Sequence, residues 1–306
     1  MKSQHPSKLV LMYHSLSSAK QPCVLGSFPV EFSDFKAHLH AFIDLGYQIK
    51  PSKYLQRTPE SGEKWLFVTS DDGTVDWTRN ALPWCESQNI YTHTAVVTGP
   101  WQAQPIYPLA HWLQVLLALR TSSELEVLAG QVSGCLTEDE KKYIDRIYAY
   151  ETQPVRRLLK GACNLILTDA KAREVLGDMS AKEQEALACR FESPDYFQHL
   201  NYAELGTHTV SHSALGENVE HYMRHEIDAS HQHLLDLNLQ PSHYFTLPMK
   251  PKFGATLHDL TQRLQQKSYH GLLYSAYEEW DGRSFVIPRL DAKSIPTFLE
   301  KMKRQA

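Results

Sequence analysis

Strand and helix patterns alternate at both ends of this 306-residue chain but not in its middle. Short apolar runs, typical of buried strands, alternate with amphipathic helical patterns up to about residue 100 and again from about residue 201. Parallel strands need helical crossovers, so this rhythm predicts a parallel α/β barrel that is interrupted once. Since 42% of the residues are hydrophobic, the chain can bury a core of the required size.

The two ends of the chain supply the expected barrel elements. In the first part we expect strands at 9–12, 65–69 and 92–98 and helices at 33–45 and 75–89. In the last part we expect a strand that ends at Thr207, helices at 219–237, 256–267 and 295–304, a strand at 244–247, and short strands near Leu272 and Phe285.

The middle of the chain differs, because it contains almost no strand pattern. Periodic apolar positions predict helices near 112–119, 125–132, 138–149, 155–167 and 181–191. We interpret residues 101–200 as a helical insertion, with a discontinuous barrel at 1–100 and 201–306, since loops tolerate long insertions. An independent domain that binds a partner protein is the alternative.

The charge of the chain excludes some partners. Lys and Arg number 31 against 35 Asp and Glu, which gives a formal net charge of -4 without a run of like charges, so we expect no nucleic-acid partner. The apolar run at 9–13 is too short for a secretion signal or a transmembrane segment, and the five cysteines include no Cys-x-x-Cys pair. We therefore expect a cytoplasmic protein with a neutral or weakly charged substrate.

Two adjacent carboxylates, Asp71 and Asp72, follow an apolar strand and precede Gly73. Active sites of α/β barrels lie at this end of the strands. Because neighbouring side chains diverge at a strand end, one carboxylate could bind a metal while the other acts as a base. Asp-Asp-Gly is also a common turn and helix cap, so the pair alone does not define a site.

Two histidines, His208 and His212, lie four residues apart after the strand that contains Gly206. On a helical turn this spacing places both imidazoles on one face, where they can bind one cation. A chain with 16 histidines contains such pairs by chance, and His221 with His225 is another. The second pair lies in a polar helical pattern, so we assign the metal site to the first.

Both motifs resemble those of a known family. Thr69-Ser70-Asp71-Asp72-Gly73 looks like the Thr-Phe-Asp-Asp-Gly motif of the polysaccharide deacetylases, also called the NodB-homology or carbohydrate esterase family four fold. Residues 208–212 are similar to the His-Ser/Thr-x-x-His motif of that family, and the resemblance covers about residues 8–99 and 201–292. It implies a distorted TIM-like (β/α) barrel of the polysaccharide deacetylase type with a mostly helical insertion.

The resemblance also implies roles for these residues. In the family the first Asp is the general base, while the second Asp and both His hold a divalent metal, usually zinc. Carried over, Asp71 is the base, and the metal ligands are Asp72, His208 and His212. Such ligands suit Zn²⁺, and Co²⁺, Ni²⁺ or Fe²⁺ would also fit. The implied reaction is metal-dependent removal of an N-acyl group, foremost N-acetyl, from an amino sugar or a sugar-containing precursor.

The chain departs from the family in three places. Ser70 replaces the usual Phe, the Arg often found before Pro248 is absent, and no clear Leu-x-His motif follows. The last departure leaves the general acid without a motif.

Two residues are candidates for the remaining catalytic roles. Arg289, at the end of the last strand pattern, could orient Asp71 and lower its pKa, or it could bridge a surface carboxylate. His14, after the first strand, could protonate the leaving amine, or it could be structural. His270 is a weaker candidate for the acid.

Other functions fit the same residues. A non-carbohydrate amidohydrolase that acts on cyclic amides or imides is one alternative, since a fold does not fix a substrate. A catalytically inactive sugar-binding or assembly protein with a structural metal is another. Aromatic side chains expected near the rim could stack on a sugar or pack in the core: Trp77, Trp101, Tyr244, Phe253 and Trp280.

Overall fold

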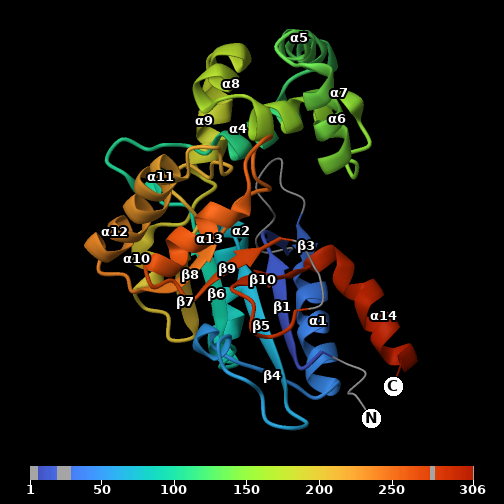
Figure 1. The fold of residues 1–306 in the computed structure, drawn as a ribbon, viewed down its shortest axis with the longest axis vertical. Helices are drawn as coiled ribbons and strands as arrows, with labels where there is room; N and C mark the ends of the chain where they lie inside the picture. Colours follow the sequence, from blue (N-terminus) through green and yellow to red (C-terminus); the bar gives the residue numbers. More distant parts are fainter. Residues whose placement is uncertain (1–5, 19–28, 276–279, 306) are drawn as a thin grey trace.

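Nine parallel strands form the main sheet of this protein, which we describe from a computed structural model that covers residues 6–18, 29–275 and 280–305 (Figure 1). The sheet has the order β10-β9-β8-β7-β6-β5-β1-β11, and β4 also pairs with β5. Its strands are β1 (Lys8–Tyr13), β4 (Tyr47–Ile49), β5 (Lys64–Ser70), β6 (Thr92–Val96), β7 (Ala203–Thr207), β8 (Pro241–Thr246), β9 (Gly271–Tyr274), β10 (Val286–Pro288) and β11 (Leu290–Asp291). A small separate sheet pairs β2 (Leu16–Ser17) with β3 (Val30–Glu31).

The last strand segment nearly closes the sheet into a barrel. β10 pairs with β9, with Ile287 opposite Leu273. β11 pairs with β1, with Leu290 opposite Leu11. Only Arg289 separates β10 from β11, so one short segment joins the two ends of the sheet. The expected parallel α/β barrel is confirmed.

Helices cover the outside of the barrel. Among them, α1 (Phe32–Asp44) buries Phe35, Leu39 and Phe42, whose spacing places them on one helical face. These side chains belong to a core cluster with Leu9 and Leu11 of β1. The other outer helices are α2 (Val75–Thr78), α3 (Leu82–Ser87), α10 (Pro194–Phe197), α11 (Val219–Tyr222), α12 (Ala229–Asp236), α13 (Leu257–Gln266) and α14 (Ile295–Gln305).

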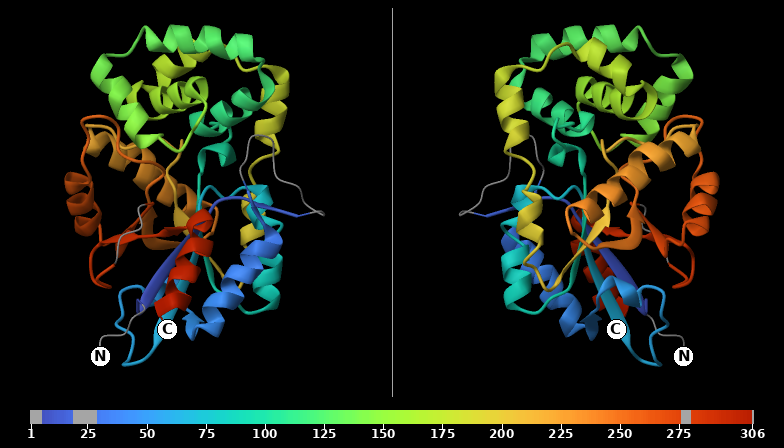
Figure 2. Two further views of the ribbon diagram at one scale, coloured as in Figure 1. Left: turned by 90° about the vertical axis from the view of Figure 1, so that its right-hand side faces the viewer. Right: turned by 90° about the vertical axis from the view of Figure 1, so that its left-hand side faces the viewer.

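A block of helices between β6 and β7 lies beyond the carboxyl ends of the strands (Figure 2). This helical block comprises α4 (Leu109–Leu119), α5 (Ser122–Ser133), α6 (Glu138–Ile147), α7 (Pro154–Gly161), α8 (Asp169–Leu176) and α9 (Ala181–Ala188). Its buried apolar side chains form a cluster separate from the barrel core. Phe197 of α10, by contrast, lies in the barrel core and packs against Trp101. The division at residues 101 and 200 therefore stays a prediction.

Several helices differ from the expected ones. The single helix expected at 75–89 is divided into α2 and α3, because Pro83 lacks the amide hydrogen needed inside a helix and instead lies in the first turn of α3. The helix expected at 219–237 contains a π-helical segment, Met223–Asp228, between α11 and α12. α8 was not among the expected helices. No helix in the described ranges has both the length and the apolarity needed to cross a membrane.

Candidate metal centre

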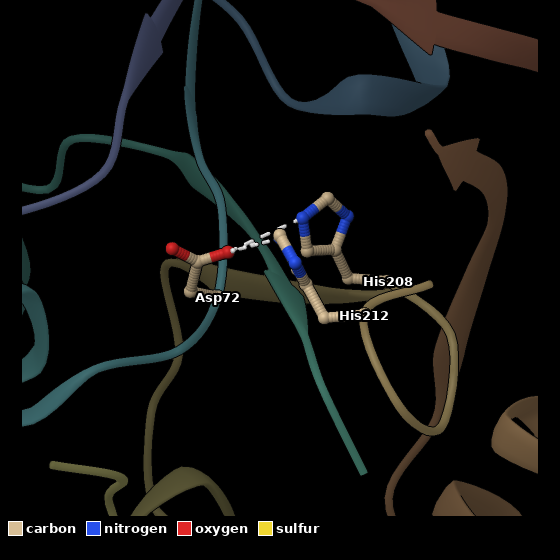
Figure 3. A group of neighbouring side chains, drawn as sticks. All are labelled: Asp72, His208 and His212. Atoms are coloured by element: carbon tan, nitrogen blue, oxygen red, sulfur yellow. Dashed lines mark ion pairs between the residues drawn. The ribbon is translucent and has the colours of Figure 1, made fainter. Parts of the chain in front are cut away.

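Asp72, His208 and His212 meet at the carboxyl end of the barrel strands (Figure 3). Oδ1 of Asp72 lies 3.3 Å from Nε2 of His208 and 3.1 Å from Nε2 of His212. The three potential ligand atoms are all within 4.8 Å of one another, and no side chain of the three is more than 10% exposed. The structure thus brings together the three residues expected to hold a metal.

The two histidines lie on a loop rather than on the helical turn we expected. His208 directly follows β7, and the backbone φ angles of Thr209 and His212 are +69° and +58°. A right-handed helix requires negative φ, so the helical interpretation was wrong. The loop is held by its own polar groups, because the amide of His212 donates to Oγ1 of Thr209 and the amides of Val210 and Ser211 donate to the carboxylate of Glu226.

The donor atoms fit a divalent cation. Among the residues that the structure describes, Oδ1 of Asp72 and Nε2 of His208 are buried without a hydrogen-bond partner, which is costly unless another group satisfies them. Nδ1 of His208 lies 2.9 Å from the carbonyl oxygen of Thr246. A carbonyl can only accept, so Nδ1 carries the hydrogen and Nε2 presents its lone pair to the site.

The protonation states also suit metal binding. Burial alone would raise the pKa of Asp72, but His111 and His212 hold it well below its usual value. Burial lowers the pKa of His212. An ionised carboxylate and a neutral imidazole are the forms that coordinate a metal.

Asp71 faces Arg289 instead of the cluster. Nη1 of Arg289 donates to Oδ1 of Asp71 at 2.6 Å, and Nη2 donates to Oδ2 at 2.7 Å. Burial would raise the pKa of Asp71, but the Arg289 guanidinium outweighs it and lowers this pKa below its usual value. Because Arg289 is fully buried, it does not bridge a surface carboxylate. Asp71 is therefore an ionised carboxylate beside the cluster.

The two acid candidates lie in different places. Nε2 of His14 is 3.7 Å from Oδ2 of Asp71, and the His14 side chain is 45% exposed at the rim. His270 directly precedes β9, where it packs against His243 and Tyr244 at the amino end of the strands. His270 is thus remote from the cluster and was a wrong candidate.

Other expectations about the rim require correction. Trp77 of α2 is buried among the side chains that pack between the barrel and its outer helices, and Tyr244 is buried in the barrel. Trp280 packs against Lys8 at the start of β1, the end opposite the cluster. Trp101 packs on Phe197, and the half-exposed Phe253 packs on Tyr143. The exposed pair His221 and His225 has no third metal ligand near it in the part of the chain that the structure describes.

His111, which comes from the first turn of α4, is a further site residue that no sequence motif predicted. It is 1% exposed, and its Nε2 lies 3.4 Å from Oδ2 of Asp72. Burial lowers the pKa of His111 to about 3. Its only sequence signal is an imidazole inside an otherwise apolar helical pattern.

Comparisons with known proteins give a fold but no sequence family. No family model and no curated protein matches the chain. The structure of IcaB from Ammonifex degensii matches with a TM-score of 0.57 at 14% identity, covering 97% of both chains. The fold is that of the polysaccharide deacetylases. The Streptococcus pyogenes deacetylase PplD in complex with acetate and the Bacillus cereus polysaccharide deacetylase BC0361 also match, each with a TM-score of 0.49, at 14% and 13% identity. The match with PplD covers 92% of this chain and 91% of PplD. The match with BC0361 covers 95% of this chain and 68% of BC0361.

Proposed function

We propose that this protein is a metal-dependent hydrolase that removes an N-acyl group, foremost N-acetyl, from an amino sugar or a sugar-containing precursor. The main support is that Oδ1 of Asp72 and Nε2 of His208 are buried without a hydrogen-bond partner in the described ranges of the chain. A second carboxylate, Asp71, lies beside these two atoms and is not part of the cluster. A purely structural metal site has no use for this second, ionised carboxylate. The polysaccharide deacetylase fold supports hydrolysis of an amide on a sugar.

The cluster supplies the metal ligands in this proposal. Asp72, His208 and His212 would hold the cation, with Zn²⁺ the best match to two imidazoles and one carboxylate. A divalent ion held by such ligands acts as a Lewis acid on the acyl carbonyl and makes water a better nucleophile at neutral pH. Three protein ligands leave room for water and substrate.

Asp71 acts as the base. Because Arg289 keeps it ionised, Asp71 can take a proton from the attacking water at neutral pH. Each carboxylate oxygen has two lone pairs, so the contact with Arg289 leaves acceptor capacity. Arg289 also fixes the direction of the carboxylate, which proton transfer requires.

His14 is the proposed acid. As the C–N bond breaks, the leaving amine needs a proton, and an imidazole can supply it near neutral pH. His14 is the exposed histidine next to Asp71, so its ring is accessible to a substrate that enters at the rim. The products are a free amine on the sugar and the carboxylate of the acyl group.

The test measures bound metal and acetate release on the same samples. Wild type should contain about one zinc ion per chain and release acetate from N-acetylated sugars, whereas His208→Ala should lose both. Asp71→Asn should keep the metal and lose acetate release, because it changes the base and no ligand. His221→Ala, in the exposed second pair, is the matched control and should behave as wild type.

Elemental analysis gives the decisive outcome. Wild type without bound metal would overturn the proposal. Bound metal without acetate release would exclude the N-acetyl sugars tested and direct the assay to cyclic amides and imides.

A further inference from the structure

We infer that His111, which the helical block supplies, is a positioning residue that holds Asp72 in the orientation needed for metal binding. This inference rests on the proposed metal site. The two oxygens of Asp72 have different neighbours: Oδ1 faces His208 and His212, while Oδ2 is 3.4 Å from Nε2 of His111. Figure 3 shows the first oxygen pointing to both imidazoles and the second pointing away from them.

The chemistry of this contact defines which atom donates. A carboxylate oxygen accepts, so Nε2 of His111 has to carry the hydrogen that points to Asp72. Nδ1 of His111 is then a buried acceptor that has no partner among the residues described. An imidazole on Oδ2 prevents the carboxylate from rotating that oxygen into the cluster, and it leaves Oδ1 as the ligand atom.

The surroundings of His111 fix its ring. Its centroid lies 4.9 Å from that of Phe191 and 5.3 Å from that of His212. Phe191 in turn forms a β-bridge with Thr74, two residues after Asp72. The ring is therefore packed between the loop that carries a metal ligand and the segment that leaves the helical block.

Backbone bonds tie the same segment to the residues after Asp72. The amide of Val75 donates to the carbonyl of Arg190 at 2.9 Å, and the Arg190 side chain donates to Gln114 of α4. The segment that follows the helical block is thus attached both to the residues after Asp72 and to α4, which carries His111. A helical block without influence on Asp72 would need neither of these two hydrogen bonds.

The geometry favours positioning over direct ligation. His111 is not among the residues whose donor atoms all lie within 4.8 Å of one another. A fourth protein ligand would also fill the position that a hydrolase leaves for water. Residues that hydrogen-bond a metal ligand typically change metal affinity by roughly 10–100-fold.

The experiment measures Zn²⁺ affinity by competition with a chromophoric chelator, using the full chain. His111→Phe removes the donor, and His111→Asn shortens it so that it no longer reaches Asp72; both should raise the Kd for Zn²⁺ by roughly 10–100-fold. His111→Gln places an amide N–H near the position of Nε2 and should restore most of the affinity. His221→Gln is the matched control and should bind as wild type.

The visible spectrum of the Co²⁺-loaded protein separates a positioning residue from a ligand. We expect the same band pattern in wild type and in His111→Gln, because no ligand is exchanged. Unchanged Zn²⁺ affinity in both His111→Phe and His111→Asn would overturn the inference and leave the proposed function intact. A changed Co²⁺ spectrum in His111→Gln would make His111 a ligand and also overturn it. Wild type that binds no Zn²⁺ would overturn the proposed function and this inference together.

Discussion

At the scale of single residues, Arg289 and Asp71 form a buried ion pair beside the cluster. Both side chains are almost completely shielded from solvent, and Nη1 of Arg289 also donates to Oγ1 of Thr69. Taking one partner away from such a pair leaves an uncompensated charge in a medium of low dielectric. The loss of stability caused by a substitution in this pair therefore depends on the charged group that stays buried.

Arg289→Met removes the positive member of this pair. The variant should lower the free energy of unfolding by about 3–5 kcal/mol, because the Asp71 carboxylate stays buried without its partner. The double variant Asp71→Asn/Arg289→Met should lose less unfolding free energy than the two single variants lose in sum, since it removes both charges. Urea unfolding of the four proteins measures the coupling. Additive changes in unfolding free energy would contradict the prediction.

The site residues differ in how far the sequence reveals them. Asp71, Asp72, His208 and His212 lie in short motifs after strand patterns, so their common location at the carboxyl end of the strands follows from the expected fold. His111 lies in no motif. Its contact with Asp72 arises only when the helical block docks on the barrel, and local sequence patterns do not encode that arrangement.

At the scale of elements, the close approach of α6 and α7 depends on Gly161. A Cβ atom at this position would overlap Ile144 of α6, which is 1% exposed. The helical block contains a second helical glycine, Gly130 of α5, where an added Cβ would meet no atom of the described residues within 4 Å. Substitutions at the two glycines can therefore distinguish the effect of helix propensity on stability from the effect of packing.

Alanine at these two positions should have opposite effects. Gly130→Ala should stabilise the protein by about 0.5–1 kcal/mol, because alanine loses less backbone entropy in a helix. Gly161→Ala gains the same propensity but should be net destabilising by about 1–2 kcal/mol, because the overlap with Ile144 forces the helices apart. Thermal unfolding measures both. A stabilising Gly161→Ala would show that α6 and α7 are not packed this closely.

The elements that the sequence analysis misjudged have local causes. A periodic apolar pattern continues across Pro83, so periodicity alone merged α2 and α3. Four-residue spacing suggested a helix at His208 and His212, but positive φ at Thr209 and His212 excludes one. Neither residue is a glycine, so composition gave no sign of the left-handed backbone.

At the scale of the whole molecule, a buried histidine links stability to pH. His93 of β6 lies inside the barrel, 3% exposed, with Nε2 2.7 Å from Oγ of Ser242. Burial lowers its pKa from 6.5 to about 4. Below pH 6.5 His93 therefore binds a proton in the unfolded chain, whereas in the folded barrel it binds one only below about pH 4. The His93 contribution to the free energy of unfolding is therefore fully present above pH 6.5 and is lost as the pH falls from 6.5 to about 4.

The prediction compares wild type with His93→Gln at two pH values. Between pH 7 and pH 5 the His93 contribution to the free energy of unfolding should fall by roughly 2 kcal/mol, so the variant should lose that much less stability than wild type. Urea unfolding at each pH provides the values, and the exposed His221→Gln should follow wild type. Equal losses in wild type and His93→Gln would contradict a neutral, buried His93.

The overall architecture was the most predictable level. Alternating strand and helix patterns indicated a parallel barrel, and the barrel is confirmed. The position of the helical block beyond the strand ends was not predictable, because a periodic pattern shows which helix face is apolar but not which surface covers it.

Closure of the barrel at Arg289 has a consequence for the nascent chain. β1 is the first strand of the sheet to leave the ribosome, whereas β11, its neighbour on one side, is made after every other strand. Until then one edge of β1 presents unpaired N–H and C=O groups, and Asp71 has no guanidinium beside it. During translation an almost complete sheet therefore exists for some time with one unpaired strand edge and one unpaired carboxylate. Chains in such a state are prone to aggregation, and chaperones protect them from it.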